Sequence, residues 1–73
     1  MKLKKYMEVR AKKEKMGIKE YIYKFAYENG FSGYTLEAWV YENRRPSIDH
    51  AAKLVKATKG ELSLDAIYER YIK

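Results

Sequence analysis

The sequence predicts an all-α fold in a single domain, and three observations support this prediction. The 73 residues include only four glycines and one proline, which divide the chain into segments of helical length. Apolar residues within these segments recur at the spacing of a helix face, and no segment shows the sustained alternation typical of a strand. The length is that of one small domain, so we expect residues 1–73 to form one unit of five helices.

The first two helices are expected before Gly30. Residues 2–15 form a Lys-rich helix, and its narrow stripe for packing consists of Leu3, Tyr6, Met7 and Arg10. The second helix begins near residue 18, and its inward face consists of Ile18, Ile22, Phe25 and Ala26. Gly30 ends this helix, because glycine accepts the left-handed conformation that a helix C-terminus commonly needs.

The remaining three helices are expected to begin at Ser32, Ser47 and Ser63, which can cap them. The third is short and buries Leu36, Trp39 and Val40. The fourth has Asp49 in its first turn, where the helix dipole favours an anion. Its inward face is predicted to consist of Ile48, Ala51, Ala52 and Val55. Gly60 stops the fourth helix, and the last helix carries Leu64, Ile67, Tyr68 and Tyr71.

Composition argues against several classes of function. The chain has no cysteine and a single histidine, His50, so thiolate metal sites, cysteine nucleophiles and histidine clusters are excluded. No nucleophile or oxyanion donor accompanies the Asp49–His50 pair at a recognisable spacing, so we expect no enzyme, no cofactor and no small-molecule substrate. The longest apolar run has four residues, so we expect no membrane partner and a cytoplasmic, nucleoid-associated protein.

The net charge of +6 is unevenly distributed. Residues 1–24 hold nine basic and three acidic groups, whereas residues 25–73 hold seven of each, so the whole excess lies in the first third. This asymmetry favours an anionic partner such as nucleic acid. An ordinary solvated basic helix is the alternative interpretation.

The segment from about residue 22 to residue 41 meets the requirements of two helices that cross steeply over a short turn. Such a crossing needs a small residue, a turn residue that tolerates positive φ, and an apolar wedge; the sequence supplies Ala26, Gly30, and Phe31 with Leu36 and Trp39. This set resembles the helix-turn-helix motif of the phage Cro and repressor families. The stretch 25–39, the sequence Arg44-Arg45-Pro46-Ser47 and the stretch 56–68 are all similar to small Cro-like and YdaS-like regulators, so the resemblance covers about residues 18–70.

The chain departs from the family pattern at two positions. Asn29 occupies a position that is usually aliphatic, and Glu42 stands where a glycine commonly follows the recognition helix. We expect Asn29 to cap the second helix and Asn43 to take the left-handed conformation that the glycine would have taken.

The resemblance implies a compact helix-turn-helix domain of the lambda-repressor-like type, in which residues 32–41 lie in the major groove of DNA. The residues that would face the groove are Ser32, Gly33, Tyr34, Glu37 and Ala38, with Thr35 and Tyr41 on the flanks. Those expected at phosphates are Asn43, Arg44, Arg45, Tyr23 and Tyr27. Glu37 could accept a hydrogen bond from cytosine N4; alternatively, it is a solvated glutamate. Gly33 would matter only by allowing a close backbone approach.

The function implied is that of a Cro-like transcriptional repressor, a homodimer on a pseudo-palindromic operator in double-stranded DNA. Candidates for the dimer surface are the last helix, with Tyr68, Tyr71 and Ile72, or the loop around Leu62, which could also tuck into the core. Two alternatives stay open. One is an excision-directing or architectural DNA-binding factor, and the other is an antitoxin-like protein-interaction module.

Overall fold

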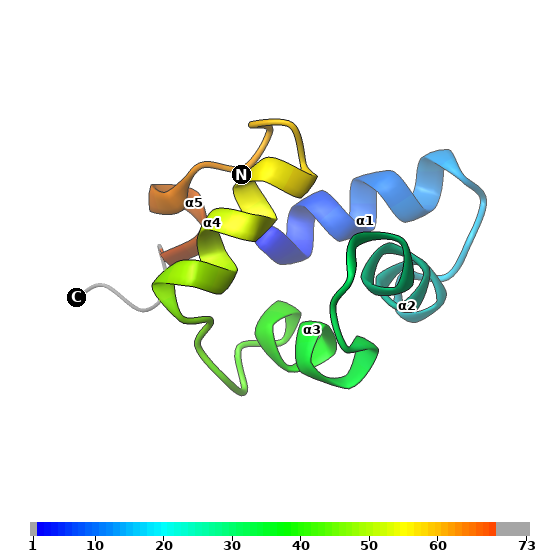
Figure 1. Cartoon of the computed structure of the whole chain (residues 1–73). Helices are drawn as coiled ribbons and strands as arrows, with labels where there is room; N and C mark the ends of the chain where they lie inside the picture. Colours follow the sequence, from blue (N-terminus) through cyan, green and yellow to red (C-terminus); the bar gives the residue numbers. More distant parts are fainter. Residues whose placement is uncertain (1, 69–73) are drawn as a thin grey trace.

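A computed structural model describes residues 2–68 as five α-helices, and no strand occurs in this range (Figure 1). The helices are α1 (Leu3–Lys13), α2 (Ile18–Asn29), α3 (Gly33–Val40), α4 (Ile48–Ala57) and α5 (Leu64–Tyr68). The predicted all-α class and the five predicted helices are confirmed. Among the described residues, no helix combines the length and the apolar character needed to cross a membrane.

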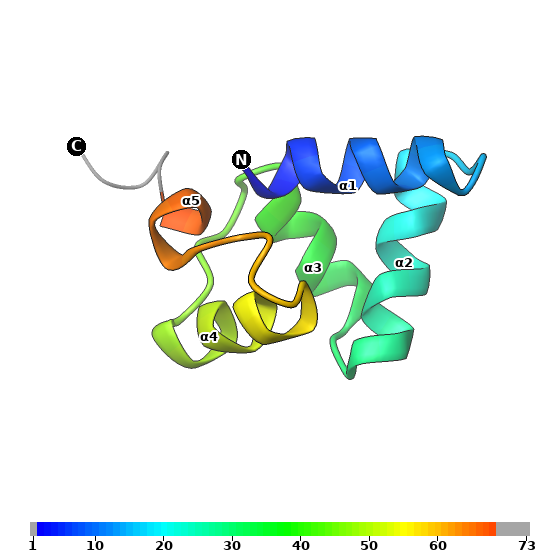
Figure 2. The same ribbon diagram turned by 90° about the horizontal axis from the view of Figure 1, so that it is seen from above.

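The helix α3 lies at one edge of the molecule, below α1 and α4 in the view of Figure 1. Figure 2 shows α1 and α4 on opposite sides of α3, while α2 and α5 lie at opposite ends of the molecule. Every helix contributes to one core, whose fully buried members include Met7 of α1, Ile22 of α2, Leu36 of α3 and Leu54 of α4. The buried face of α1 consists of Leu3, Tyr6, Met7 and Ala11. Because the core surrounds the inner side of α3, only the outer side of this helix faces solvent.

The turn between α2 and α3 has the predicted chemistry. Gly30 follows α2 with φ +78°, in the left-handed region. The side-chain amide of Asn29 donates to the Phe25 carbonyl, one turn back along α2, at 2.9 Å, while the cap position is taken by Gly30, whose N–H donates to the Ala26 carbonyl. Ser32 caps α3, since its hydroxyl oxygen accepts from the Thr35 main-chain N–H at 3.4 Å. Three residues, 30–32, therefore connect the two helices.

The end of α3 differs from the prediction by one residue. Glu42, and not Asn43, takes the left-handed conformation, with φ +64°. The Asn43 N–H donates to the Ala38 carbonyl at 2.8 Å and the Glu42 N–H donates to the Trp39 carbonyl at 3.2 Å, which is the Schellman pattern. This pattern requires its left-handed residue directly after the helix cap, Tyr41, so the strained position falls on Glu42.

The buried face of α4 also differs from the prediction. Ile48 is 64% exposed and Ala52 is exposed, whereas Ala51 and Leu54 are buried. The reason lies beyond the helix, where the chain folds back after Gly60. The Leu62 N–H donates to the Thr58 hydroxyl at 3.3 Å, and both residues are buried. The helix is consequently rotated so that Leu54 and Thr58 face the core in place of Ile48 and Ala52.

Two of the residues named as candidates for a dimer surface are buried in the described part of the chain. Leu62 is fully buried, so the alternative in which it tucks into the core is confirmed. Tyr68 is buried as well. These two side chains are part of the core of the chain itself and are not exposed for contact with a second copy. Tyr71 and Ile72 lie outside the described residues.

Candidate nucleic-acid interface

The outer side of α3 and the segment that follows it form a shallow hollow, here called the α3 hollow. It is lined by Tyr34, Glu37, Ala38, Tyr41, Asn43 and Arg44. All six are among the residues predicted from the sequence to contact DNA. The side chains of α3 that were predicted to face inward, Leu36 and Trp39, are buried. The structure therefore separates an inner and an outer side of α3 as the sequence predicted, with one exception at Ala38.

The exception is that Ala38 is only 9% exposed. The main-chain N–H groups of Asn43 and Arg44 both donate to the Ala38 carbonyl, at 2.8 and 3.3 Å, so the chain folds back over this residue. Ala38 consequently forms the floor of the α3 hollow. Ala38 therefore lies on the outer side of α3, as predicted, but it is less exposed than expected, because the segment after the helix folds back at this residue.

Glu37 is held by two side chains of α2. Its Oε1 accepts a hydrogen bond from the Tyr23 hydroxyl at 2.8 Å, and its Oε2 lies 3.7 Å from the ammonium nitrogen of Lys19. The Glu37 side chain is 25% exposed. The hydrogen bond to this carboxylate stabilises the neutral phenol and raises the pKa of Tyr23. Glu37 is therefore not a freely solvated glutamate.

The ring of Tyr23 accounts for the glycine at position 33. A Cβ atom placed on Gly33 would lie 2.5 Å from the Tyr23 Cδ2 atom, closer than any real carbon contact. The backbone of α3 at Gly33 and the phenol ring of α2 are thus in direct contact. Gly33 was predicted to matter by allowing a close approach, and the partner that approaches in the structure is Tyr23.

Sequence reasoning did not single out Lys19 in this arrangement. Lys19 and Tyr23 are four residues apart on α2, so they share one face of the helix. The spacing was visible in the sequence, but their common partner Glu37 is 14 residues beyond Tyr23. Only the crossing of α2 over α3 brings the three side chains together.

Exposed aromatic side chains lie on both α2 and α3. Tyr34 is 73% exposed and Tyr27, on α2, is 90% exposed, as predicted. Tyr41, at the end of α3, is also exposed, and the ammonium nitrogen of Lys4 lies 5.6 Å from the centre of its ring. This cation–π contact places one positive charge of α1 at the edge of the hollow.

The two predicted phosphate-binding arginines, Arg44 and Arg45, are exposed beside the hollow. They line a second depression together with Thr35, Trp39, Ser47 and His50. The guanidinium of Arg45 lies 5.1 Å from the centre of the Tyr68 ring, which holds the arginine stem against the body of the protein. His50, for which the sequence predicts no catalytic role, also lines this depression. Its ring lies 5.1 Å from the Trp39 ring and 2.9 Å from the Ser47 hydroxyl.

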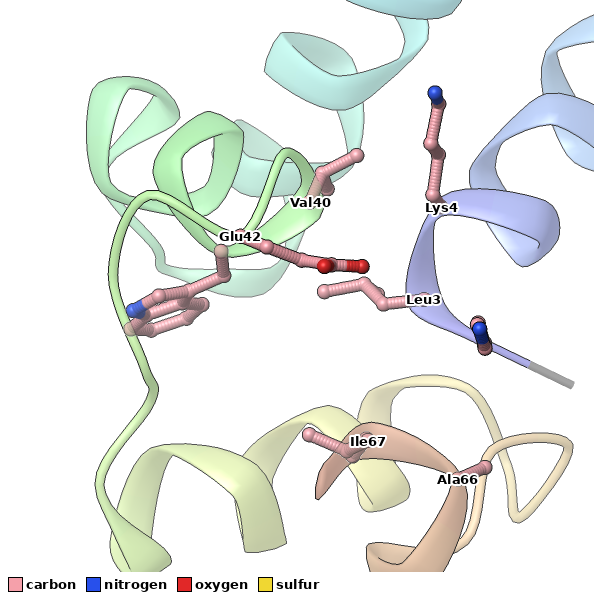
Figure 3. A pocket seen from close by; sticks show the side chains of 8 residues that line it. Leu3, Lys4, Val40, Glu42, Ala66 and Ile67 are labelled. Atoms are coloured by element: carbon pink, nitrogen blue, oxygen red, sulfur yellow. The ribbon is translucent and has the colours of Figure 1, made fainter. Parts of the chain in front are cut away.

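A further hollow between α1, α3 and α5 offers no room for a substrate (Figure 3). Its lining includes Leu3, Val40, Glu42 and Ile67, and in Figure 3 the Glu42 carboxylate extends between the Val40 and Leu3 side chains. Its volume of about 10 Å³ is at most that of one water molecule. Among residues 2–68, no three His, Cys, Asp or Glu side chains come together in a way that could hold a metal ion.

Comparisons with protein-family models, curated proteins and solved structures found no significant match. The resemblance to Cro-like regulators therefore stays a prediction from the residues quoted for it.

Proposed function

We propose that the protein binds double-stranded DNA sequence-specifically, as a small Cro-like repressor, with α3 in the major groove. The observation that supports this most directly is the outer side of α3. The short helix α3 follows a three-residue turn and precedes a segment that contains two arginines. Its outer side presents Tyr34, Glu37 and Tyr41 at the α3 hollow. Its inner side is buried in the core, so the outer side is the part of α3 that a partner can reach.

The dimensions of α3 suit a major groove. An α-helix with its side chains is about 10 to 12 Å in diameter, so it fits the major groove of B-DNA, which is about 12 Å wide. Ser32 and Gly33 are at the start of α3. In helix-turn-helix proteins, the N-terminal residues of the recognition helix come nearest to the base edges. Tyr34 would contact thymine methyl groups, and Glu37 would accept from cytosine N4.

The positive charges around the α3 hollow would contribute to affinity, and the negative charge of Glu37 would contribute to specificity. Arg44, Arg45 and Lys4 supply positive charge at its edge, where phosphates would lie. Glu37 adds a negative charge, but Lys19 compensates for part of it. A compensated carboxylate is repelled less strongly by phosphates than an isolated one, so Glu37 can serve base recognition without preventing association.

A homodimer on a pseudo-palindromic site would double the few base pairs that one α3 can read. Since Leu62 and Tyr68 are buried, the two copies would meet through other residues.

The experiment is a selection of bound sequences from a random duplex pool, with the wild-type protein and with Glu37→Gln. We expect the wild type to enrich a short palindrome. Glu37→Gln is expected to retain binding and to change the preference at one position in each half-site, because glutamine can also pair with adenine. Failure of the wild type to enrich any sequence would contradict the proposal. Enrichment of A/T tracts without a palindrome would support an architectural factor in its place.

A further inference from the structure

We propose that Tyr23 is a positioning residue for sequence specificity, which holds the Glu37 carboxylate in a single orientation toward the base edges. This inference rests on the proposed function. It assigns Tyr23 a different task from the phosphate contact that the sequence predicted. The two tasks make opposite demands on the Tyr23 hydroxyl, and the geometry of α2 and α3 distinguishes them.

The first step concerns the single proton of the Tyr23 hydroxyl. A phenol has one O–H to donate, and in the structure Tyr23 donates it to Glu37 Oε1 at 2.8 Å. A phosphate oxygen is an acceptor only, so it would need the same proton. While the hydrogen bond to Glu37 is present, Tyr23 has no proton for DNA.

The second step concerns the freedom of the Tyr23 ring. The ring packs so closely on Gly33 that even a methyl group at that position would collide with it. The side chain is 41% exposed, so one face is open to solvent and the other is covered by the α3 backbone. The hydroxyl is consequently presented at a defined place above α3, and Glu37 lies one helical turn beyond Gly33 on the same face.

The third step concerns what remains available on Glu37. A carboxylate offers about four lone-pair sites. Tyr23 occupies one on Oε1, and Lys19 is paired with Oε2 at a longer distance of 3.7 Å. Sites on both oxygens therefore remain for a base amino group. Because the rotamer is already restricted, less conformational entropy is lost when the base contact forms.

The test compares Tyr23→Phe with Tyr27→Phe. The first variant keeps the ring against Gly33 and removes only the hydroxyl. The second removes the same atom one helical turn further along α2, from a side chain that is 90% exposed. For each variant, affinity is measured by fluorescence anisotropy on the duplex selected by the wild type and on all its single-base variants. Thermal unfolding of each variant verifies that it is folded.

We expect Tyr23→Phe to lose about two- to tenfold in discrimination at the base pair whose preference Glu37→Gln changes. Discrimination elsewhere stays as in the wild type, and Tyr27→Phe has no position-specific effect. The double variant Tyr23→Phe/Glu37→Gln is expected to discriminate no less than Glu37→Gln alone, because both changes act through the same carboxylate.

The possible failures are distinguishable. If Tyr23→Phe weakens binding equally on every duplex, its hydroxyl contacts the backbone and the inference is wrong, while the proposed function stands. If all relative affinities are unchanged, the contact with Glu37 serves the fold alone, and the inference is again wrong. If the wild type selects no sequence, the proposed function fails and the inference fails with it.

Discussion

The hydroxyl of Tyr68 donates a hydrogen bond to the main-chain carbonyl of Pro46 at 3.0 Å, across 22 residues of sequence. The same ring lies beneath the guanidinium of Arg45. The short helix α5 is thereby tied to the segment that leads from α3 to α4. This contact explains why α5 belongs to the core and how the segment that carries the two arginines is kept in place.

Removing this hydroxyl should lower the stability of the fold. Tyr68→Phe leaves the buried Pro46 carbonyl without its donor, so the free energy of unfolding should fall by about 1 to 3 kcal/mol. Urea denaturation followed by circular dichroism measures this loss. Tyr27→Phe, at an exposed position, is the control and should change it by less than about 0.5 kcal/mol. Equal effects of the two variants would contradict a role for the Tyr68 hydroxyl.

The crossing of α2 over α3 depends on the sizes of two buried side chains. Trp39 contacts Phe31 edge to face and is 4% exposed, so Trp39→Ala should cost about 3 to 5 kcal/mol of stability. Ala26→Leu should overpack the crossing and cost about 1 to 3 kcal/mol. Thermal unfolding measures both. A variant that keeps full stability and loses only DNA affinity would show that the inner and outer faces are assigned the wrong way round.

The left-handed residues Lys15 and Glu42 should respond differently to glycine. Both have positive φ, at +56° and +64°, and glycine relieves the strain that a Cβ atom causes there. Lys15 is exposed, so Lys15→Gly should raise the free energy of unfolding by about 1 kcal/mol. Glu42→Gly should raise the free energy of unfolding by less, because the Glu42 side chain lines the small hollow between α1, α3 and α5 and its contacts there would be lost. Chemical denaturation of both variants decides this, and a larger gain at Glu42 would contradict it.

DNA binding, if it follows the proposal, should depend strongly on salt. The logarithm of affinity should fall linearly with that of salt concentration, by about 0.9 for each neutralised phosphate. Replacing Arg44 and Arg45 by alanine should flatten this slope equally on specific and random duplexes. Lys56→Ala, near the opposite end of α4, removes one positive charge away from this segment and should leave the slope unchanged. An unchanged slope in the arginine double variant would remove this segment from the interface.

The hydrogen bond between Tyr23 and Glu37 should be visible in the titration of the phenol. The pKa of Tyr23 is raised above its usual value of about 10, chiefly by this bond, so Glu37→Gln should lower the pKa. Since the folded-state pKa is the higher one, the stability that the bond contributes is complete below about pH 10 and is lost as the pH rises through the folded-state pKa.

The control for this titration is Tyr6, whose pKa is raised mainly by burial and which should not respond to Glu37→Gln. The Cζ resonances of labelled tyrosines, recorded as a function of pH, separate the two phenols. A Tyr23 titration that is the same with and without Glu37 would show that the hydrogen bond does not persist in solution.

The sequence by itself determined the features that depend on local chemistry. The all-helical class, the end of α2 at Gly30 and the starts of α3 and α4 at Ser32 and Ser47 could all be predicted. Each of these depends on a residue and its neighbours within one turn, through a cap or a backbone preference. The burial of Leu36 and Trp39 was equally predictable, because the period of a helix assigns them to one face.

Tertiary structure alone decided the features that depend on segments far apart in the chain. The rotation of α4 toward Leu54 requires the return of the chain at Leu62, and the burial of Ala38 requires the segment after α3 to fold back. The pairing of Tyr23 with Glu37 requires the crossing of two helices. Periodicity states which residues share a face, but the angle at which that face meets its neighbours is set by packing between elements, and no single segment contains that information.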